Sequence, residues 1–306
     1  MGGARMIYDI RQTTTYDYAS KVSYAHHVLH LMPINRPRQR VHAAALEILP
    51  MPVERREGFD FFGNHVTWIG LEEAHDSLSI KVMARVAVEA PADPAPLETP
   101  PWEEVRAAVM MTSDLGATSP AHFLFPSRLV SLDPEIADYV RKSFAPGRPV
   151  FDGAADLMRR IKSDFKYEVG VTSVATTPTA AYALRRGVCQ DFAHIMISGL
   201  RGIGLPAAYV SGYLRTVPKE GRKRLEGADA MHAWVMVWCG EAAGWCGFDP
   251  TNAILVGDDH VTLAIGRDYS DIAPIAGVVF GSGDQHLKVA VDVIPVESMA
   301  SRPVET

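Results

Sequence analysis

The chain has 306 residues, of which 47% are hydrophobic and 22% are charged, a composition typical of a folded globular protein. The formal net charge of −6 argues against general binding to nucleic acid or to anionic membranes. Three cysteines are too few for a disulfide framework, and their odd number leaves at least one thiol free.

The sequence contains no apolar run of the roughly 18 residues that cross a bilayer. The first residues also lack the apolar core of a secretory signal. We therefore expect a cytoplasmic protein. In a reducing compartment each cysteine is core filler, a metal ligand or a nucleophile.

The first part of the chain predicts a β-rich domain, over residues 1–90. Short segments rich in β-branched and aromatic residues are separated by turn residues, and the last of them alternates apolar and polar side chains, as a half-buried strand does. The segments are Ile7–Tyr18, Val41–Leu49, His65–Leu71 and Leu78–Glu89. Five prolines within residues 91–101 then predict a linker, because proline is excluded from helix interiors and central strands.

Beyond the linker the pattern changes to helices and then returns to strands. Expected helices are Trp102–Met111, Pro134–Phe144, Gly153–Phe165, Pro178–Arg186 and Val188–Ile203, the last with apolar residues at spacings of three and four. Strands follow from residue 207 to about 295. Helices followed by antiparallel strands indicate an α+β domain over residues 102–295, with a flexible tail at 296–306.

Cys189 is the first candidate for chemistry. It lies in the first turn of the strongest helix, where free backbone N–H groups and the positive end of the helix dipole favour thiolate over thiol. A cysteine nucleophile also needs a base. His194 is close in sequence, but five residues turn the helix by about 500°, so it projects roughly 140° away from Cys189.

His232 and Asp249 are better placed partners. His232 opens an alternating strand, and Asp249 ends the next strand after a short turn. In a hairpin centred on Gly240 and Glu241 the two side chains lie opposite each other, and a loop centred slightly later makes them diagonal neighbours on the same face. Asp249 would then fix the tautomer of the imidazole and stabilise its cation.

The other candidate ligands have simpler interpretations. Three histidines, His26, His27 and His30, lack the carboxylate of a zinc-binding motif, and we expect them to be surface or core residues. Cys239 and Cys246 share the hairpin face opposite His232, so they should pack into the sheet. The sequence has no EF-hand pattern, and we expect no metal and no cofactor.

Three segments resemble the bacterial transglutaminase-like superfamily, whose relatives include papain-like cysteine proteases. They are GVCQDFAHIMISGLRGIGLPAAYVSGYL around Cys189, MHAWVMVW around His232 and GWCGFDPTN around Asp249, within a core of about 150–265. The β-rich first domain is similar to that of a bacterial subgroup. The resemblance implies an α+β fold with the Cys189 helix packed on an antiparallel sheet. It also implies Cys189 as nucleophile, His232 as general base and acid, and Asp249 as orienting acid.

The implied reaction is acyl transfer from a peptide or protein amide through a thioester, resolved by water in a hydrolase or by an amine in a transglutaminase. The oxyanion would contact the Cys189 backbone N–H and a second donor, for which Gln190, Tyr167 and a nearby Trp are candidates. We expect hydrolysis, that is, a cysteine protease or amidohydrolase. The alternatives are a protein-crosslinking transglutaminase, with Trp234 and Trp238 lining a tunnel for the amine, and a non-catalytic peptide-binding module on the same fold.

Overall fold

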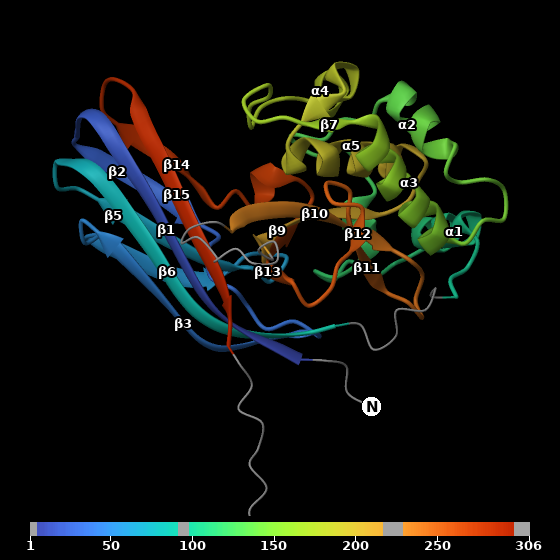
Figure 1. Ribbon diagram of the computed structural model, residues 1–306, viewed down its shortest axis with the longest axis horizontal. Helices are drawn as coiled ribbons and strands as arrows, with labels where there is room; N and C mark the ends of the chain where they lie inside the picture. Colours follow the sequence, from blue (N-terminus) through green and yellow to red (C-terminus); the bar gives the residue numbers. More distant parts are fainter. Residues whose placement is uncertain (1–4, 91–97, 217–228, 297–306) are drawn as a thin grey trace, which may run out of the picture.

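The computed structural model describes residues 5–90, 98–216 and 229–296. Two units lie side by side, a β-sandwich and an α+β unit (Figure 1). The α+β fold class expected from the sequence is confirmed. Among the described residues no helix has the length and apolar character needed to span a membrane.

The β-sandwich contains two antiparallel sheets of four strands, in the orders β15-β1-β6-β3 and β14-β2-β5-β4. All four predicted segments of the first 90 residues are strands. The strand bounds are β1 (Arg5–Val22), β2 (Tyr24–Leu29), β3 (Gln39–Leu49), β4 (Glu54–Phe59), β5 (His65–Leu71), β6 (His75–Glu89), β14 (Ile275–Phe280) and β15 (Gln285–Pro295).

The last two strands correct the expected domain boundary. β14 pairs with β2, and β15 pairs with β1 along Tyr8–Tyr18, so the end of the chain returns to the first unit. Residues 102–295 are therefore not one domain. The alternating pattern of 285–295 reveals a strand but not its partner, because pairing depends on contacts distant in sequence. Of the predicted linker and tail, residues 91–97 and 297–306 lie outside the described residues.

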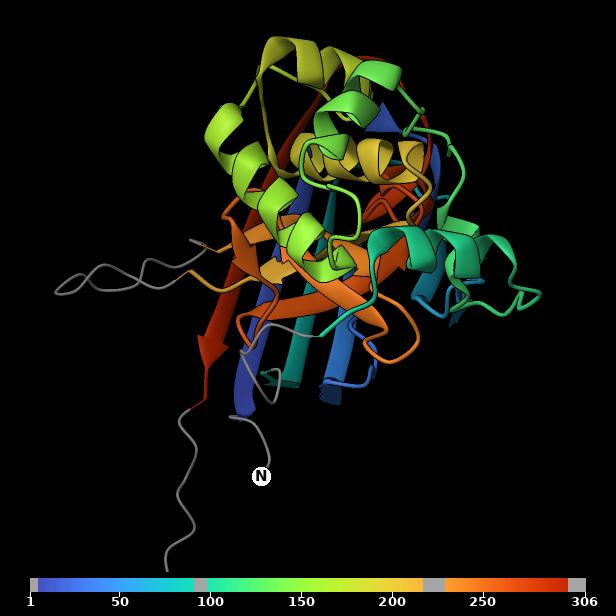
Figure 2. The same ribbon diagram turned by 90° about the vertical axis from the view of Figure 1, so that its right-hand side faces the viewer.

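The α+β unit packs helices on one face of an antiparallel sheet with the order β12-β11-β10-β9-β13 (Figure 2). All five predicted helices are present. The helices are α1 (Trp102–Met110), η1 (Pro120–Phe123), α2 (Pro134–Arg141), α3 (Val150–Asp164), α4 (Pro178–Leu184), α5 (Cys189–Gly202) and η2 (Tyr269–Asp271). The strands are β9 (Ala207–Leu214), β10 (Ala230–Trp238), β11 (Trp245–Asp249), β12 (Ile254–Leu255) and β13 (His260–Gly266), and a parallel pair forms from β7 (Lys166–Tyr167) and β8 (Arg186–Gly187).

Helix α5 is the centre of this unit. Its side chains are buried on all sides, with Ile195, Met196 and Leu200 at 0% exposure, as expected for a helix enclosed by other elements. Neighbouring α2 approaches it so closely that a Cβ atom at Gly199 would lie 2.2 Å from Val140 Cγ2. The N-terminus of α5 is therefore held in a fixed position by the core.

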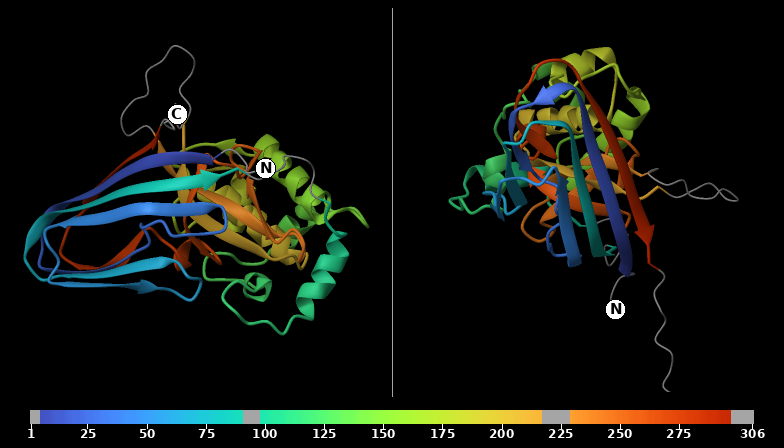
Figure 3. Two further views of the ribbon diagram at one scale, coloured as in Figure 1. Left: turned by 90° about the horizontal axis from the view of Figure 1, so that it is seen from below. Right: turned by 90° about the vertical axis from the view of Figure 1, so that its left-hand side faces the viewer.

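The long strands of the sandwich also cover the other face of this sheet, and they run toward the α+β unit (Figure 3). Tyr8 and Ile10 of β1 pack with Tyr213 of β9 and Val261 of β13 in one buried cluster. The five-stranded sheet thus lies between the α5 layer and the sandwich.

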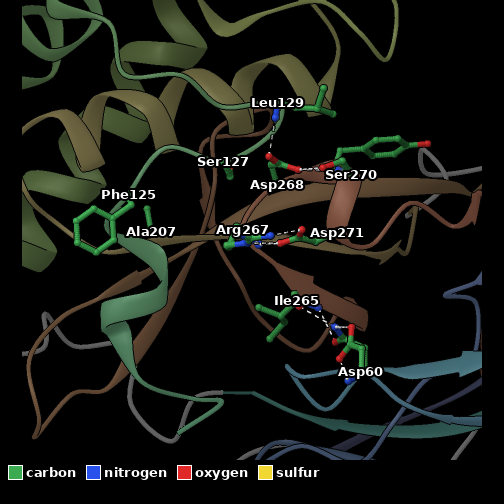
Figure 4. Close-up of polar contacts among 12 residues, drawn as sticks. Asp60, Phe125, Ser127, Leu129, Ala207, Ile265, Arg267, Asp268, Ser270 and Asp271 are labelled. Atoms are coloured by element: carbon green, nitrogen blue, oxygen red, sulfur yellow. Dashed lines mark hydrogen bonds and ion pairs between the residues drawn. The ribbon is translucent and has the colours of Figure 1, made fainter. Parts of the chain in front are cut away.

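Two amide side chains fix this arrangement at β13, an edge strand. Gln39 donates to Thr262 O (2.7 Å) and accepts from Thr262 N (2.8 Å). Asn64 does the same at Ile265, with both distances 2.8 Å. Each amide therefore takes the place of a neighbouring strand. It pairs with a backbone N–H and C=O of β13 that would otherwise be buried without a hydrogen-bond partner. Asp60 accepts from Asn64 and orients it (Figure 4).

A buried arginine stabilises the opposite end of α5. Arg201 donates to Ala207 O, Phe125 O and Arg267 O, which belong to three separate segments. The adjacent Asp268 accepts from Leu129 N at 2.7 Å (Figure 4). These bonds tie α5 to the loop before α2 and to the end of β13.

We predict that Asn64→Ala lowers the free energy of unfolding by on the order of 3 kcal/mol, because it leaves the Ile265 N–H and C=O unpaired in a buried interface. Urea denaturation followed by circular dichroism measures the loss. The exposed Asn35, which accepts from Val41 N, provides the control: Asn35→Ala should cost less than about 1 kcal/mol. Equal losses for the two variants would contradict the role of Asn64.

Candidate active site

Cys189 begins α5, as predicted, and its side chain is partly exposed. The preceding turn is held by Asp191, whose Oδ2 accepts from Val188 N (2.8 Å) and from Thr172 Oγ1 (2.7 Å). A Cβ atom at Gly187 would lie 2.5 Å from the same oxygen, so only glycine leaves room for this carboxylate. The local sequence thus fixes the thiol at a helix N-terminus.

His232 lies near the start of β10, opposite Gly212 of β9. Its Nε2 is 2.8 Å from Asp249 Oδ2, and the ring lines the same cleft as Cys189, whose charge raises the pKa of the ring. Because Nε2 is occupied by the carboxylate, Nδ1 is the ring nitrogen available to the sulfur. The structure therefore brings together the three residues that the sequence singled out.

The residue pairing in the β10–β11 hairpin differs from that of a loop centred on Gly240 and Glu241. Val235 pairs with Phe248 and Trp238 with Trp245, so the loop is centred one residue later than Gly240 and Glu241. His232 and Asp249 are consequently diagonal rather than direct neighbours. They remain on one face because the two-residue side-chain period is preserved, and the hydrogen bond forms across the diagonal.

Asp249 is fully buried and is held by four further donors. Its Oδ1 accepts from the backbone N–H groups of Thr251 (2.9 Å) and Asn252 (3.2 Å), and Oδ2 accepts from Asn252 Nδ2 (2.7 Å) and lies 3.5 Å from His260 Nε2. Burial alone raises the pKa of this carboxyl, but the bonds from His232 and His260 outweigh it and hold the pKa well below its usual range.

Asn252 and His260 were not identified from the sequence. Asn252 follows Asp249 by three residues in a turn, a spacing at which Asp and Asn side chains commonly bond the local backbone, so a signal existed. His260 comes from the next long strand, β13, and nothing in its neighbours indicates where its ring points.

The charge state of His232 follows from these contacts. Burial lowers the pKa of the imidazole, but the hydrogen bond to Asp249 and the nearby Cys189 outweigh this effect and raise the pKa to about 9. The ring is therefore a cation at neutral pH.

The remaining histidines and cysteines lie elsewhere. His194 is buried and accepts from Tyr269 N, and burial lowers its pKa to about 4. Cys239 and Cys246 belong to the main hydrophobic cluster, which confirms their predicted packing. The three histidines of 26–30 lie in β2 or just after it, in the sandwich. Within the described ranges no cluster of three or more His, Cys, Asp or Glu side chains is arranged to hold a metal ion.

A cleft of about 270 Å³ opens beside Cys189 at the junction of the two units. The α+β unit contributes Cys189, His232 and Tyr209, and the sandwich contributes Tyr16, Leu287 and Val289. A substrate that reaches the thiol therefore contacts both units.

The three candidates for the second oxyanion donor have different surroundings. Gln190 lines the cleft, and its side-chain amide donates one of its two N–H groups to Val174 O (3.1 Å). No tryptophan is among the described residues that line the cleft. Tyr167 pairs through its backbone with Gly187, and its pKa is raised by burial and by the nearby Cys189. Of the three, Gln190 lines the cleft, whereas Tyr167 is not among the described residues of its lining.

Comparison with known proteins gives matches over most of the chain. The family model for a bacterial transglutaminase-like N-terminal region matches residues 8–87, and the model for the transglutaminase-like superfamily matches residues 137–250. The second range includes Cys189, His232 and Asp249.

Curated relatives cover nearly the full length. An uncharacterised protein of Mycobacterium tuberculosis is 36% identical over 304 residues, covering 96% of this chain and 94% of the relative. Another, from Mycobacterium leprae, is 32% identical over 285 residues, with 92% and 96% covered. The crystal structure of "a Putative Cysteine Protease from Cytophaga hutchinsonii" superposes with a TM-score of 0.76 at 22% identity, covering 97% of this chain and 93% of that one. At that identity the likeness shows the fold.

We predict that the charge on His232 makes stability depend on pH. Because the pKa of His232 is raised from 6.5 to about 9, the protonated ring stabilises the folded state fully below pH 6.5. This stabilisation is lost as the pH rises through 9. The loss is about 3 kcal/mol at roughly 1.4 kcal/mol per pKa unit. Urea denaturation between pH 6.5 and 9.5 should show a steeper decline for the wild type than for His232→Gln.

The exposed His286 provides the control, since His286→Gln should keep the decline of the wild type. If His232→Gln also keeps it, the proposed charge state of His232 is wrong.

Proposed function

Because this chain belongs to the transglutaminase-like superfamily, we propose that it is a cysteine-dependent enzyme that hydrolyses amide bonds through a thioester on Cys189. The observation that carries the proposal is the 2.8 Å bond between His232 Nε2 and the buried Asp249, on a ring that lines the same cleft as Cys189. A nucleophile, a base and an orienting carboxylate in contact form the group that acyl transfer requires.

In the first half-reaction the Cys189 thiolate attacks the amide carbonyl carbon. The oxyanion that forms accepts from the Cys189 backbone N–H at the start of α5 and from a second donor, for which Gln190 in the cleft lining and Tyr167 are the candidates. The C–N bond then breaks, and the imidazolium of His232 gives its proton to the departing amine. The products are a free amine, a thioester and a neutral imidazole.

In the second half-reaction neutral His232 takes a proton from water, whose oxygen attacks the thioester. The C–S bond breaks, the carboxylic acid leaves, and the thiolate and imidazolium are restored. Asp249 accepts no proton in either half. It keeps Nε2 engaged, so that Nδ1 faces the sulfur throughout, and it stabilises the ring cation.

Hydrolysis is supported by the positions of Trp234 and Trp238, the residues expected to line an amine tunnel. Trp234 lines a different cavity, and Trp238 packs edge-on against Trp245 with ring centroids 5.6 Å apart. Neither is among the described residues of the cleft beside the partly exposed Cys189. Water therefore has access to a thioester there, and we assign the transglutaminase reaction as the second candidate.

The substrate class and the location also belong to this proposal. The structural neighbour named as a cysteine protease supports a peptide or protein amide as substrate, and the cleft between two units offers a surface for it. All three cysteines are free thiols, a state compatible with the cytoplasmic location expected from the sequence. A peptide-binding module without catalysis would not require the buried Asp249 network.

We predict that Cys189→Ala reduces amide cleavage by about 10³-fold or more, because the acyl acceptor of the first half-reaction is lost. The measurement is release of new amino groups and ammonia from a peptide library, with and without a primary amine such as dansylcadaverine. A hydrolase releases carboxylic acid at a rate unaffected by the amine, whereas dansylated product identifies a transferase.

Cys246→Ala is the matched control, since it removes a thiol from the core and should retain activity if the variant folds. Activity of Cys189→Ala equal to that of the wild type would rule out the proposed nucleophile.

A further inference from the structure

A second cavity, of about 430 Å³, lies on the sandwich side of the catalytic sheet. It is distinct from the cleft beside Cys189, and no described residue lines both. Its floor is formed by buried side chains, Ala208 at 1% exposure, Trp234 at 1% and His260 at 3%. Cavities of about 300–1,000 Å³ are the usual size for small-molecule sites.

The wall of this cavity is largely aromatic and aliphatic. Phe123 packs edge-on against Trp245 with ring centroids 5.1 Å apart, and Phe62 packs on Phe123 at 5.2 Å. Met236 and Val256 complete an apolar surface. Such a wall binds the hydrocarbon part of a ligand by removing its surface from water.

Arg36 and Arg38 give the cavity its charge, with Glu89 as the acidic residue of the lining. Arg36 donates through one terminal nitrogen to Asn64 Oδ1 (2.8 Å), whereas its buried Nε has no hydrogen-bond partner. Burial lowers the pKa of Arg36 to about 10, with opposition from Asp60, so the guanidinium is charged at neutral pH. Arg36 is partly buried, and a cation whose buried donor has no partner is costly unless an anion pairs with it.

These observations point to one ligand chemistry. We propose that this cavity binds a small amphiphilic carboxylate, with its apolar chain against Trp234 and the aromatic wall and its carboxylate on Arg36 and Arg38. A guanidinium fork matches a carboxylate in geometry as well as in charge. Two arginines disfavour a cationic amine, so the cavity is unsuited to the amine acceptor of a transglutaminase.

The cavity also borders the groups that support His232. Trp234 packs edge-on against His260 with centroids 5.2 Å apart, and His260 Nε2 is 3.5 Å from Asp249 Oδ2. A ligand on this floor therefore contacts Trp234 and His260, and His260 in turn lies against the candidate catalytic carboxylate of Asp249.

Isothermal titration calorimetry with decanoate, decanol and decylamine below their aggregation concentrations tests the proposal. We expect decanoate to bind at least about tenfold more tightly than decanol, and decylamine to bind more weakly still. Equal affinities for decanoate and decanol, or no binding of decanoate at millimolar concentration, would overturn it.

Variants locate the site. Arg36→Gln and Arg38→Gln should each weaken decanoate binding by about tenfold. Arg40→Gln is the matched control, because Arg40 is exposed on the same segment and does not line this cavity. Gly257→Leu should abolish binding by filling the space, since a Cβ atom there meets no atom within 4 Å. Decanoate affinity unchanged in both Arg38→Gln and Gly257→Leu would place the ligand elsewhere and contradict the inference.

Discussion

The pairing of two side-chain amides with the edge of β13 is the constraint on which the arrangement of this molecule depends. Gln39 and Asn64 satisfy backbone groups of Thr262 and Ile265 as another strand would, and they thereby hold the sandwich against the catalytic sheet. Both cavities lie at this junction. The return of β15 to pair with β1 adds a second connection between the first and last parts of the chain.

Within this frame the candidate active site is built on three elements whose positions are fixed for different reasons. Core packing holds α5 and hence Cys189, the sheet positions His232, and a turn holds Asp249. The carboxylate is fully buried but has several donors, which is the condition under which a buried charge is tolerated. Its ionisation keeps His232 protonated at neutral pH.

Much of the site could be predicted from the sequence because its signals are local. A helix start placed Cys189, and the two-residue period of a hairpin placed His232 and Asp249 on one face, although the loop is centred one residue later than expected. The partnership of Cys189 with the other two was implied by the family resemblance. The pairing of β14 and β15, the role of His260 and the two cavities could not be predicted. They depend on contacts between segments far apart in the chain, which local patterns do not encode.

The rate of Cys189 alkylation by iodoacetamide as a function of pH, followed by peptide mass spectrometry, tests the central claim most directly. A thiolate stabilised by the His232 cation predicts that wild-type Cys189 reacts at pH 6–7, well before Cys239 and Cys246, and that His232→Ala shifts its reactivity toward the range of an ordinary thiol near pH 8.5. Identical pH profiles for Cys189 in the wild type and in His232→Ala would contradict the account.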